Sequence, residues 1–161
     1  MTRSTIRCTW FSADTPTIRD LVREYIASID ENACRDEVEI GLCALPAPYE
    51  ASGAGYVLIL QSEIVVGGSA FAGLDASAAE MSRLYVRPAF RGAGIVRALV
   101  SLVMMEAASS GHRRMVLHTL PDWRPARALY DELGFEPIPA YAGVGVAEAL
   151  CHARDIDSAR A

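Results

Sequence analysis

Apolar and polar positions follow one another along this chain in two different periods, and the periods predict a succession of strands and helices. Short apolar or alternating runs bounded by turn residues predict strands at 5–11, 55–61, 64–72, 80–86, 114–118, 135–138 and 146–152. Apolar positions three and four residues apart predict helices that follow Asp14 as N-cap, cover 36–45, run from 91–94 to about Ser110, and run from Pro121 to Leu133. Residues 153–161 are expected to form a frayed tail.

The order of these elements predicts the fold class. Only Ser62 and Glu63 separate two of the strands, which predicts a hairpin. A long helix lies between the strands at 80–86 and 114–118, so these two can be parallel neighbours. Early hairpins followed by β-α-β crossovers imply an α/β protein, with α+β character, in which one mixed sheet carries helices on both faces. Residues 1–152 contain no repeat or linker and are predicted to be a single domain.

Composition narrows the class of protein. The chain is 52% hydrophobic and 22% charged, as in ordinary globular proteins. It has no apolar run of about 20 residues and no secretory signal, so we expect a cytoplasmic protein without a membrane partner. A net charge of −5 argues against nucleic acid as the main partner. The four cysteines and three histidines show no metal-ligand spacing, so we expect reduced thiols and no metal.

The segment Arg91-Gly92-Ala93-Gly94-Ile95-Val96 follows a predicted strand and opens a predicted helix. Glycine allows a tight turn and a close approach of the backbone to a ligand. The unpaired N–H groups of a helix's first turn favour an anion such as a phosphate. A turn that merely needs glycine is the alternative. A dinucleotide motif would require a third glycine where the chain has Arg97, so that motif is absent.

Two longer motifs surround this segment. The first is Leu84-Tyr85-Val86-Arg87-Pro88-Ala89-Phe90-Arg91-Gly92-Ala93-Gly94-Ile95, and the second is Tyr130-Asp131-Glu132-Leu133-Gly134-Phe135. Together they resemble the GNAT superfamily of N-acetyltransferases, whose pyrophosphate motif is Arg/Gln-x-x-Gly-x-Gly/Ala after a strand ending in Val-x-Pro. The later helix of that family carries Ala-x-x-Leu-Tyr-x-x-x-Gly-Phe, which Ala126, Leu129, Tyr130, Gly134 and Phe135 match. The resemblance implies transfer of an acetyl group from acetyl-CoA to a primary amine, by direct attack and without a metal.

The resemblance also implies where acetyl-CoA lies. In the family, the strand matching 80–86 splays away from its parallel neighbour at 114–118, and the pantetheine arm occupies the gap. Leu84 and Val86 match positions whose backbone contacts that arm. The pyrophosphate rests on the amides of residues 92–96, beside Arg91.

Two side chains are candidate catalytic groups. An attacking amine must be neutral and a leaving thiolate benefits from a proton, so a base and an acid are needed. Tyr130 is the predicted acid, with simple core packing as its alternative. Glu80, at the start of its strand, is the predicted base, with a solvated carboxylate as the alternative. His118 is a second candidate base.

Two positions depart from the family pattern. Val96 replaces the last Gly/Ala of the phosphate motif, and Trp123 stands where many members carry an asparagine. They leave open a second function, an acyl-CoA-binding sensor or interaction module with little turnover. A binding domain that takes no CoA would require the whole match over 80–136 to be accidental.

The acceptor is the least specified partner. Over residues 30–50, Arg35 is the single basic residue against six acidic ones, which are Asp30, Glu31, Asp36, Glu37, Glu39 and Glu50. An acidic rim would attract a small cationic amine, although ordinary solvated helices would have the same composition. A homodimer is expected from the habit of the family.

Overall fold

The computed structural model describes residues 4–9, 11–28, 47–141, 143–144 and 148–156. Within them, seven strands form one sheet in the order β1-β2-β3-β4-β5-β7-β6. The strands are β1 Ser4–Thr9, β2 Gly55–Gln61, β3 Ile64–Gly73, β4 Ala78–Val86, β5 Arg114–Thr119, β6 Glu136–Ile138 and β7 Leu150–Asp155. The helices are α1 Phe11–Ser28, α3 Ala47–Glu50, α4 Ile95–Ser109 and α5 Arg124–Glu132, with a short 3-10 helix η1 at Pro88–Phe90.

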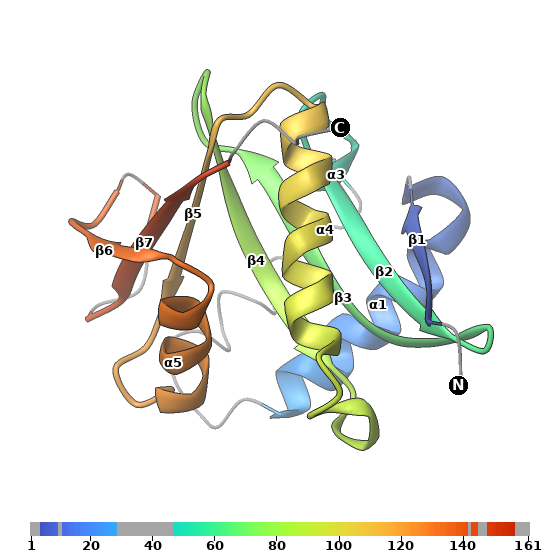
Figure 1. Ribbon diagram of the computed structural model, residues 1–161. Coiled ribbons are helices and arrows are strands. Elements are labelled where there is room, and N and C mark those ends of the chain that lie inside the picture. Colours follow the sequence, from blue (N-terminus) through green and yellow to red (C-terminus); the bar gives the residue numbers. More distant parts are fainter. Residues whose placement is uncertain (1–3, 10, 29–46, 142, 145–147, 157–161) are drawn as a thin grey trace.

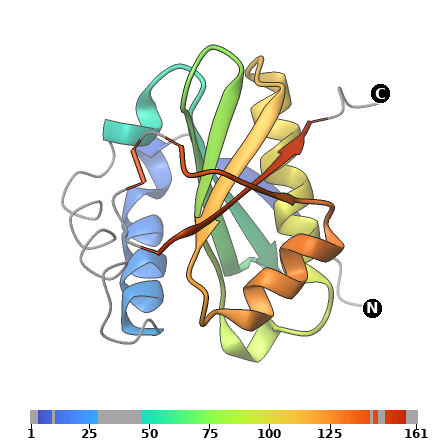
Figure 2. The same ribbon diagram turned by 90° about the vertical axis from the view of Figure 1, so that its left-hand side faces the viewer.

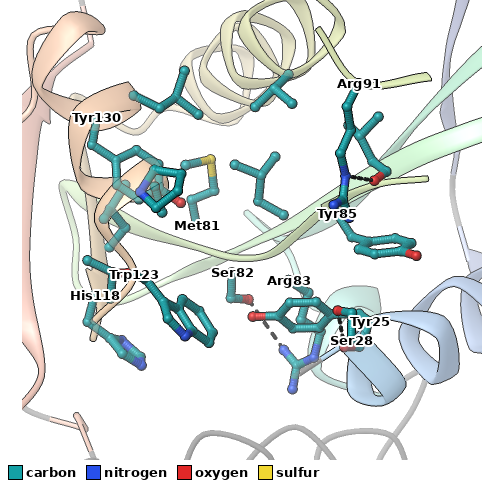
Figure 3. A pocket seen from close by; sticks show the side chains of 18 of the residues that line it. Tyr25, Ser28, Met81, Ser82, Arg83, Tyr85, Arg91, His118, Trp123 and Tyr130 are labelled. Atoms are coloured by element: carbon teal, nitrogen blue, oxygen red, sulfur yellow. Dashed lines mark hydrogen bonds between the residues drawn. The ribbon is translucent and has the colours of Figure 1, made fainter. Parts of the chain in front are cut away.

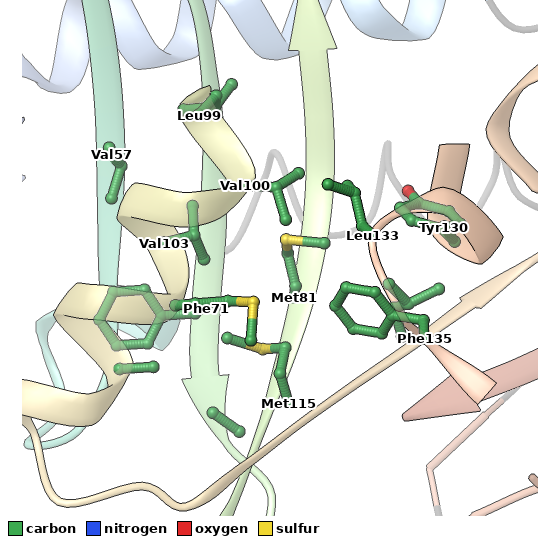
Figure 4. Packing of buried hydrophobic residues seen from close by; sticks show 14 of the residues in the cluster. Val57, Phe71, Met81, Leu99, Val100, Val103, Met115, Tyr130, Leu133 and Phe135 are labelled. Carbon is green, nitrogen blue, oxygen red and sulfur yellow. The ribbon is translucent and has the colours of Figure 1, made fainter. Parts of the chain in front are cut away.

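The two long helices cover opposite faces of the sheet (Figures 1 and 2). On one face, the apolar stripe of α4 packs into a cluster that we call the α4-side core (Figure 4), and its members include Leu99, Val103, Val57, Phe71 and Met115. On the other face, α1 contributes to the α1-side core, whose members include Ile18, Leu21, Val22, Tyr56 and Leu58. A mixed sheet with helices on both faces is thus confirmed.

The start of α1 differs from the sequence expectation. The helix begins at Phe11, so Asp14 is not its N-cap and Pro16 lies inside it. Proline cannot donate the hydrogen bond to the Ser12 carbonyl, and its ring crowds that carbonyl, so Pro16 is an unfavourable residue in the second turn of this long helix. The apolar periodicity starts at Ile18, so the earlier residues gave no signal for the first turn. The second helix, expected over 36–45, lies outside the described residues.

The β2–β3 hairpin is confirmed. Its turn residues Ser62 and Glu63 both have positive φ, at 49° and 66°, as a two-residue hairpin turn requires. The last strand was placed too early, because β7 runs to Asp155 and therefore includes three residues of the expected tail. Here Ala153 pairs with both Val116 and Glu136, so β7 lies between β5 and β6.

The β4 and β5 strands are parallel, as predicted, but they pair over a short length only. The pairs run from Ala78 with Arg114 to Glu80 with Val116, and no further. Beyond that point β5 continues to pair with β7, and β4 with β3. The two strands diverge toward the end of the sheet where α4 begins (Figure 1). From residue 81 onward, one edge of β4 therefore has no neighbouring strand.

A β-bulge interrupts β4 at Arg83. Tyr85 pairs with Gly68 and Ser82 pairs with Ala70, so two residues of β4 lie opposite Ser69 alone. Arg83 has a left-handed φ of 54°, which is unfavourable for a residue with a side chain. The buried Ser69 hydroxyl donates a hydrogen bond of 3.1 Å to the Ser82 carbonyl beside the bulge. As a result, Met81 and Leu84 both pack on the α4-side core although they are three residues apart.

An ion pair joins α1 to the end of β4. Both Arg87 Nε and Nη2 donate to the carboxylate of Glu24, at distances between 2.7 and 3.2 Å, and Arg87 Nη1 donates to the Val65 carbonyl. The Glu24 carboxylate raises the pKa of the Arg87 guanidinium further above its ordinary value. This bidentate contact fixes the position of the chain just before η1 and the start of α4.

Candidate functional site

A pocket of about 580 Å³ lies where β4 and β5 separate. Its walls come from residues 81–86 of β4, residues 117–119 of β5, the first turns of α5, and α1. Figure 3 shows Tyr130, His118 and Trp123 toward one side of this pocket, and Arg91, Tyr85 and Tyr25 toward the other. Segments far apart in the sequence thus meet around one cavity.

The glycine-rich turn at the start of α4 adjoins this pocket. Gly92 and Gly94 have φ angles of 85° and 74°, and a Cβ atom at either would meet no atom within 4 Å. Gly94 is the N-cap of α4 and offers no side chain to cap it. The first bond of the helix runs from the Ala98 amide to the Gly94 carbonyl, so the N–H groups of residues 95–97 have no partner within the helix. This turn can accept an anion on its backbone.

Six residues of this segment, 91–96, were predicted to bind the cofactor, and they do not all line the pocket. Arg91 and Val96 line the pocket, whereas Gly92, Ala93 and Gly94 are exposed beside it. The Ile95 side chain is buried in the α4-side core, so only its backbone can face a ligand. Val96 packs against the same core and keeps one side toward the pocket.

Arg91 is held in place by the strand that precedes it. Its Nε donates a hydrogen bond of 2.8 Å to the Val86 carbonyl, and its guanidinium carbon lies 5.7 Å from the centroid of the Tyr85 ring (Figure 3). Its terminal nitrogens make no hydrogen bond within the described residues and can bind an anion. Leu84 and Val86 also line the pocket, on the edge of β4 that has no neighbouring strand.

Tyr130 lines the pocket from α5 and is 8% exposed. Its ring packs edge-on against Phe135, with 5.8 Å between the ring centroids. Its hydroxyl makes no hydrogen bond within the described part of the chain. Burial raises the pKa of Tyr130 to about 12, so the phenol keeps its proton at neutral pH. The residue is therefore a packing residue that also presents a proton donor to the cavity.

Glu80 lies behind the pocket rather than in its wall. His118 lines the pocket, and its Nδ1 is 3.8 Å from Glu80 Oε2 and 3.3 Å from the Tyr141 hydroxyl. Burial opposes ionisation of Glu80, but its interactions with His118, Tyr141 and Arg83 outweigh burial and hold the pKa of the carboxyl below its ordinary value. The two candidate bases thus form one cluster, in which His118 is the member closer to the cavity.

The sequence model of the Acetyltransferase (GNAT) family matches residues 17–135 of this chain. The chain belongs to this family. The protein is accordingly an acetyltransferase. Among curated GNAT relatives, it is 31% identical over 130 residues to the uncharacterized N-acetyltransferase YjgM of Escherichia coli K12, with 78% of each chain covered.

Solved GNAT structures share the fold at low identity. A GNAT-family acetyltransferase from Staphylococcus aureus has a TM-score of 0.77 at 18% identity, covering 96% of this chain and 100% of that one. The protein yncA from Salmonella typhimurium, solved with its cofactor acetyl-CoA, has a TM-score of 0.72 at 22% identity, covering 98% of this chain and 96% of that one.

In the part of this GNAT chain that the structure describes, no helix is long and apolar enough to cross a membrane. The same residues contain no group of three or more His, Cys, Asp or Glu side chains that could hold a metal ion.

Several residues in or beside the pocket were not predicted from the GNAT motifs. Tyr141, which does not line the pocket itself, follows β6 in an irregular segment and gave no signal, because its place in the cluster depends on a contact with His118. Thr119, at the end of β5, is 2% exposed, and its hydroxyl has no hydrogen-bond partner among the residues that the structure describes. Arg83 lies within the recognised strand, but an ordinary strand would have turned its side chain to the other face. Among the acidic residues expected at the rim, only Glu50 lies in the described part, and it is exposed.

The lowered pKa of Glu80 predicts a pH-dependent contribution to stability. A carboxyl whose pKa is lower in the folded state stabilises the fold above its unfolded pKa of about 4.5, and that contribution is lost as the pH falls through the folded value. We expect Glu80→Gln to lower the free energy of unfolding at pH 7 and to cost less at pH 3.5. Urea unfolding at both pH values measures this. The exposed Glu50→Gln variant controls for the loss of one carboxylate, and equal costs of Glu80→Gln at the two pH values would contradict the prediction.

Proposed function

We propose that this GNAT protein transfers the acetyl group of acetyl-CoA to a primary amine, by direct attack of the amine on the thioester in a ternary complex. The observation that carries the proposal is that one pocket both adjoins the glycine-rich start of α4 and contains Tyr130 and His118 in its wall. One end suits an anionic cofactor, and the other offers a proton donor and a proton acceptor. The yncA structure, which shares this fold, was solved with acetyl-CoA, and this supports acetyl-CoA as the donor.

The cofactor would bind in two places. The pyrophosphate would rest on the backbone of residues 92–96, where two glycines leave space and the N–H groups are free, with the Arg91 guanidinium at the rim. The pantetheine arm would lie along the open edge of β4 and bond to the backbone of Leu84 and Val86, as an added strand does. The Val86 carbonyl already accepts a bond from Arg91, which ties the two contacts together.

The base would be the cluster of His118 and Glu80. An amine of the lysine type has a pKa of about 10.4, so it must lose a proton before it can attack. The lowered pKa of the Glu80 carboxyl makes it a poor final acceptor at neutral pH. Histidine ordinarily titrates closest to neutral pH. His118 would therefore receive the proton, directly or through water, while Glu80 holds the imidazole by charge.

Tyr130 would assist the leaving group. As the carbon–sulfur bond breaks, its electron pair moves to sulfur, and the free hydroxyl of Tyr130 can donate to the developing thiolate. A phenol with a pKa of about 12 facing a thiol of about 8.5 loses roughly 5 kcal/mol on complete proton transfer. Hydrogen-bond stabilisation of the thiolate, rather than full protonation before the bond breaks, is then the main contribution of Tyr130.

A panel of amines assayed for CoA thiol release tests the function. We expect at least one primary amine to release thiol together with an N-acetylated product. Varying both substrates should give intersecting rather than parallel kinetic lines, because both must be bound before the chemistry. Tight CoA binding without release for any amine would instead indicate a CoA-binding module.

The phosphate site predicts a specific effect of Gly94→Val. A side chain at φ 74° is strained and would fill the space that the pyrophosphate needs, so CoA affinity should fall by about tenfold or more. The shift of the melting midpoint with added CoA measures this. Gly111→Val is a matched control, since Gly111 also has a positive φ, open space and a place at the far end of α4. Equal CoA affinity in the two variants would show that the pyrophosphate binds elsewhere.

Tyr130→Phe separates catalysis from packing. The variant loses one hydroxyl and almost no volume, so the contact with Phe135 and the CoA affinity should be retained. Turnover should fall by about 10²–10³-fold, the usual effect of removing one transition-state donor. An acetyl donor with a more acidic thiol should narrow the difference, because its thiolate needs less stabilisation. Near wild-type turnover with rate-limiting chemistry would mean that Tyr130 only packs.

A further inference from the structure

The bulge in β4 turns the side chain of Arg83 toward the α1 side of the pocket. In a regular strand, Arg83 and Met81 would share a face, and Met81 packs in the α4-side core. The extra residue turns Arg83 to the opposite face, where its guanidinium carbon lies 5.6 Å from the centroid of Tyr49, a member of the α1-side core. Arg83 lines the pocket beside Tyr25 and Ser28 of α1 (Figure 3).

One nitrogen of the Arg83 guanidinium already has hydrogen-bond partners. Arg83 Nη1 donates to the Tyr49 hydroxyl and, at 3.3 Å, to Ser82 Oγ. By contrast, neither Nε nor Nη2 has a hydrogen-bond partner within the described residues, and Nε is buried. Nη2 is therefore the guanidinium nitrogen that is left to form a charge-assisted hydrogen bond with a carboxylate in the pocket.

Arg83 also has no ion-pair partner among the described residues. Arg87 and Arg97 have carboxylate partners at 2.7 Å, in Glu24 and Glu132. No carboxylate in the described part of the chain forms an ion pair with Arg83. Glu80 is near enough for Arg83 to lower its pKa, but it interacts with His118 and Tyr141. An unpaired charge and an unpaired donor in a half-buried wall are unfavourable unless a ligand completes them.

From this geometry we propose that the acceptor carries a carboxylate near its amine, and that Nη2 of Arg83 binds that carboxylate. The inference rests on the proposed function and names its substrate class, an amino acid or a similar amino-carboxylate. The amine would lie toward His118, and the carboxylate would lie under the Tyr49 and Tyr25 side of the pocket. This differs from the cationic acceptor suggested by residues 30–50, because Arg83 repels a substrate that carries positive charge alone.

Matched acceptors test the proposal at saturating acetyl-CoA. The panel holds L-amino acids, each beside its C-terminal amide, ω-amino acids of increasing length, phosphoethanolamine, spermidine and phenethylamine. We expect the best acceptor to be an amino-carboxylate whose amide has a kcat/KM lower by about 10- to 100-fold, the usual effect of a charged hydrogen-bond partner. Arg83→Gln should lower kcat/KM for the acid by a similar factor and leave the amide nearly unchanged, so the preference disappears.

Two further variants keep the test decisive. Arg23→Gln removes an exposed arginine of α1 that pairs with Asp20 outside the pocket, and it should retain the full preference. Arg83→Lys keeps the charge without the fork and should retain only part of it, which decides the matter if Arg83→Gln does not fold. CoA-induced stabilisation of each variant reports its folding. An amide, spermidine or phosphoethanolamine acetylated as well as the best amino acid would overturn the proposal while leaving the acetyltransferase function intact. Acetylation of no amine at all would overturn both.

Discussion

The end of hydrogen bonding between β4 and β5 after Glu80 is the constraint on which the rest of the structure depends. A parallel pair that stayed joined would fill the space now occupied by the pocket. Instead, β5 keeps β7 as its partner and β4 keeps β3, so each strand is satisfied on one side only. Unpaired backbone groups in a sheet are unfavourable unless water or a ligand binds them. The same divergence therefore creates both the cavity and the donors and acceptors along its wall.

The second constraint is the bulge in β4, which changes the side chains that line the α1 side of the pocket. A strand with strict alternation would have placed Arg83 against the apolar α4-side core, where its charge could not be tolerated. The left-handed conformation at Arg83 is an unfavourable local geometry that β4 and β3 together maintain, with the Ser69 hydroxyl on the adjacent carbonyl. Strained backbone positions of this kind are frequent at functional sites. Here the strained backbone places the cationic side chain of Arg83 in the pocket wall.

Much of the fold could be predicted from the sequence, because local patterns determine it. The β2–β3 hairpin, the glycine-rich start of α4 and the parallel pairing of β4 with β5 each follow from periodicity or turn residues. The extent of β7 could not be predicted, since Ala153, Arg154 and Asp155 are not a strand-like run and become one only between β5 and β6. The cluster of His118, Glu80 and Tyr141 could likewise not be predicted, because its first and last members are 61 positions apart in the sequence. The side of β4 on which Arg83 lies could not be predicted from alternation either, since a bulge depends on the partner strand.

The position of β7 has a consequence for synthesis of the protein. Among the described strands, β6 pairs only with β7, which lies between it and β5. A nascent chain that ends before residue 150 therefore has its first four strands and α4 in place, but β5 lacks one neighbour and β6 lacks a sheet to join. Pairing across long sequence separations is slow, and unpaired edges invite aggregation. The part of the molecule that carries α5 and Tyr130 must accordingly wait for the ribosome to release residues 150–155, so the half that carries the glycine-rich turn can form before the half that carries Tyr130.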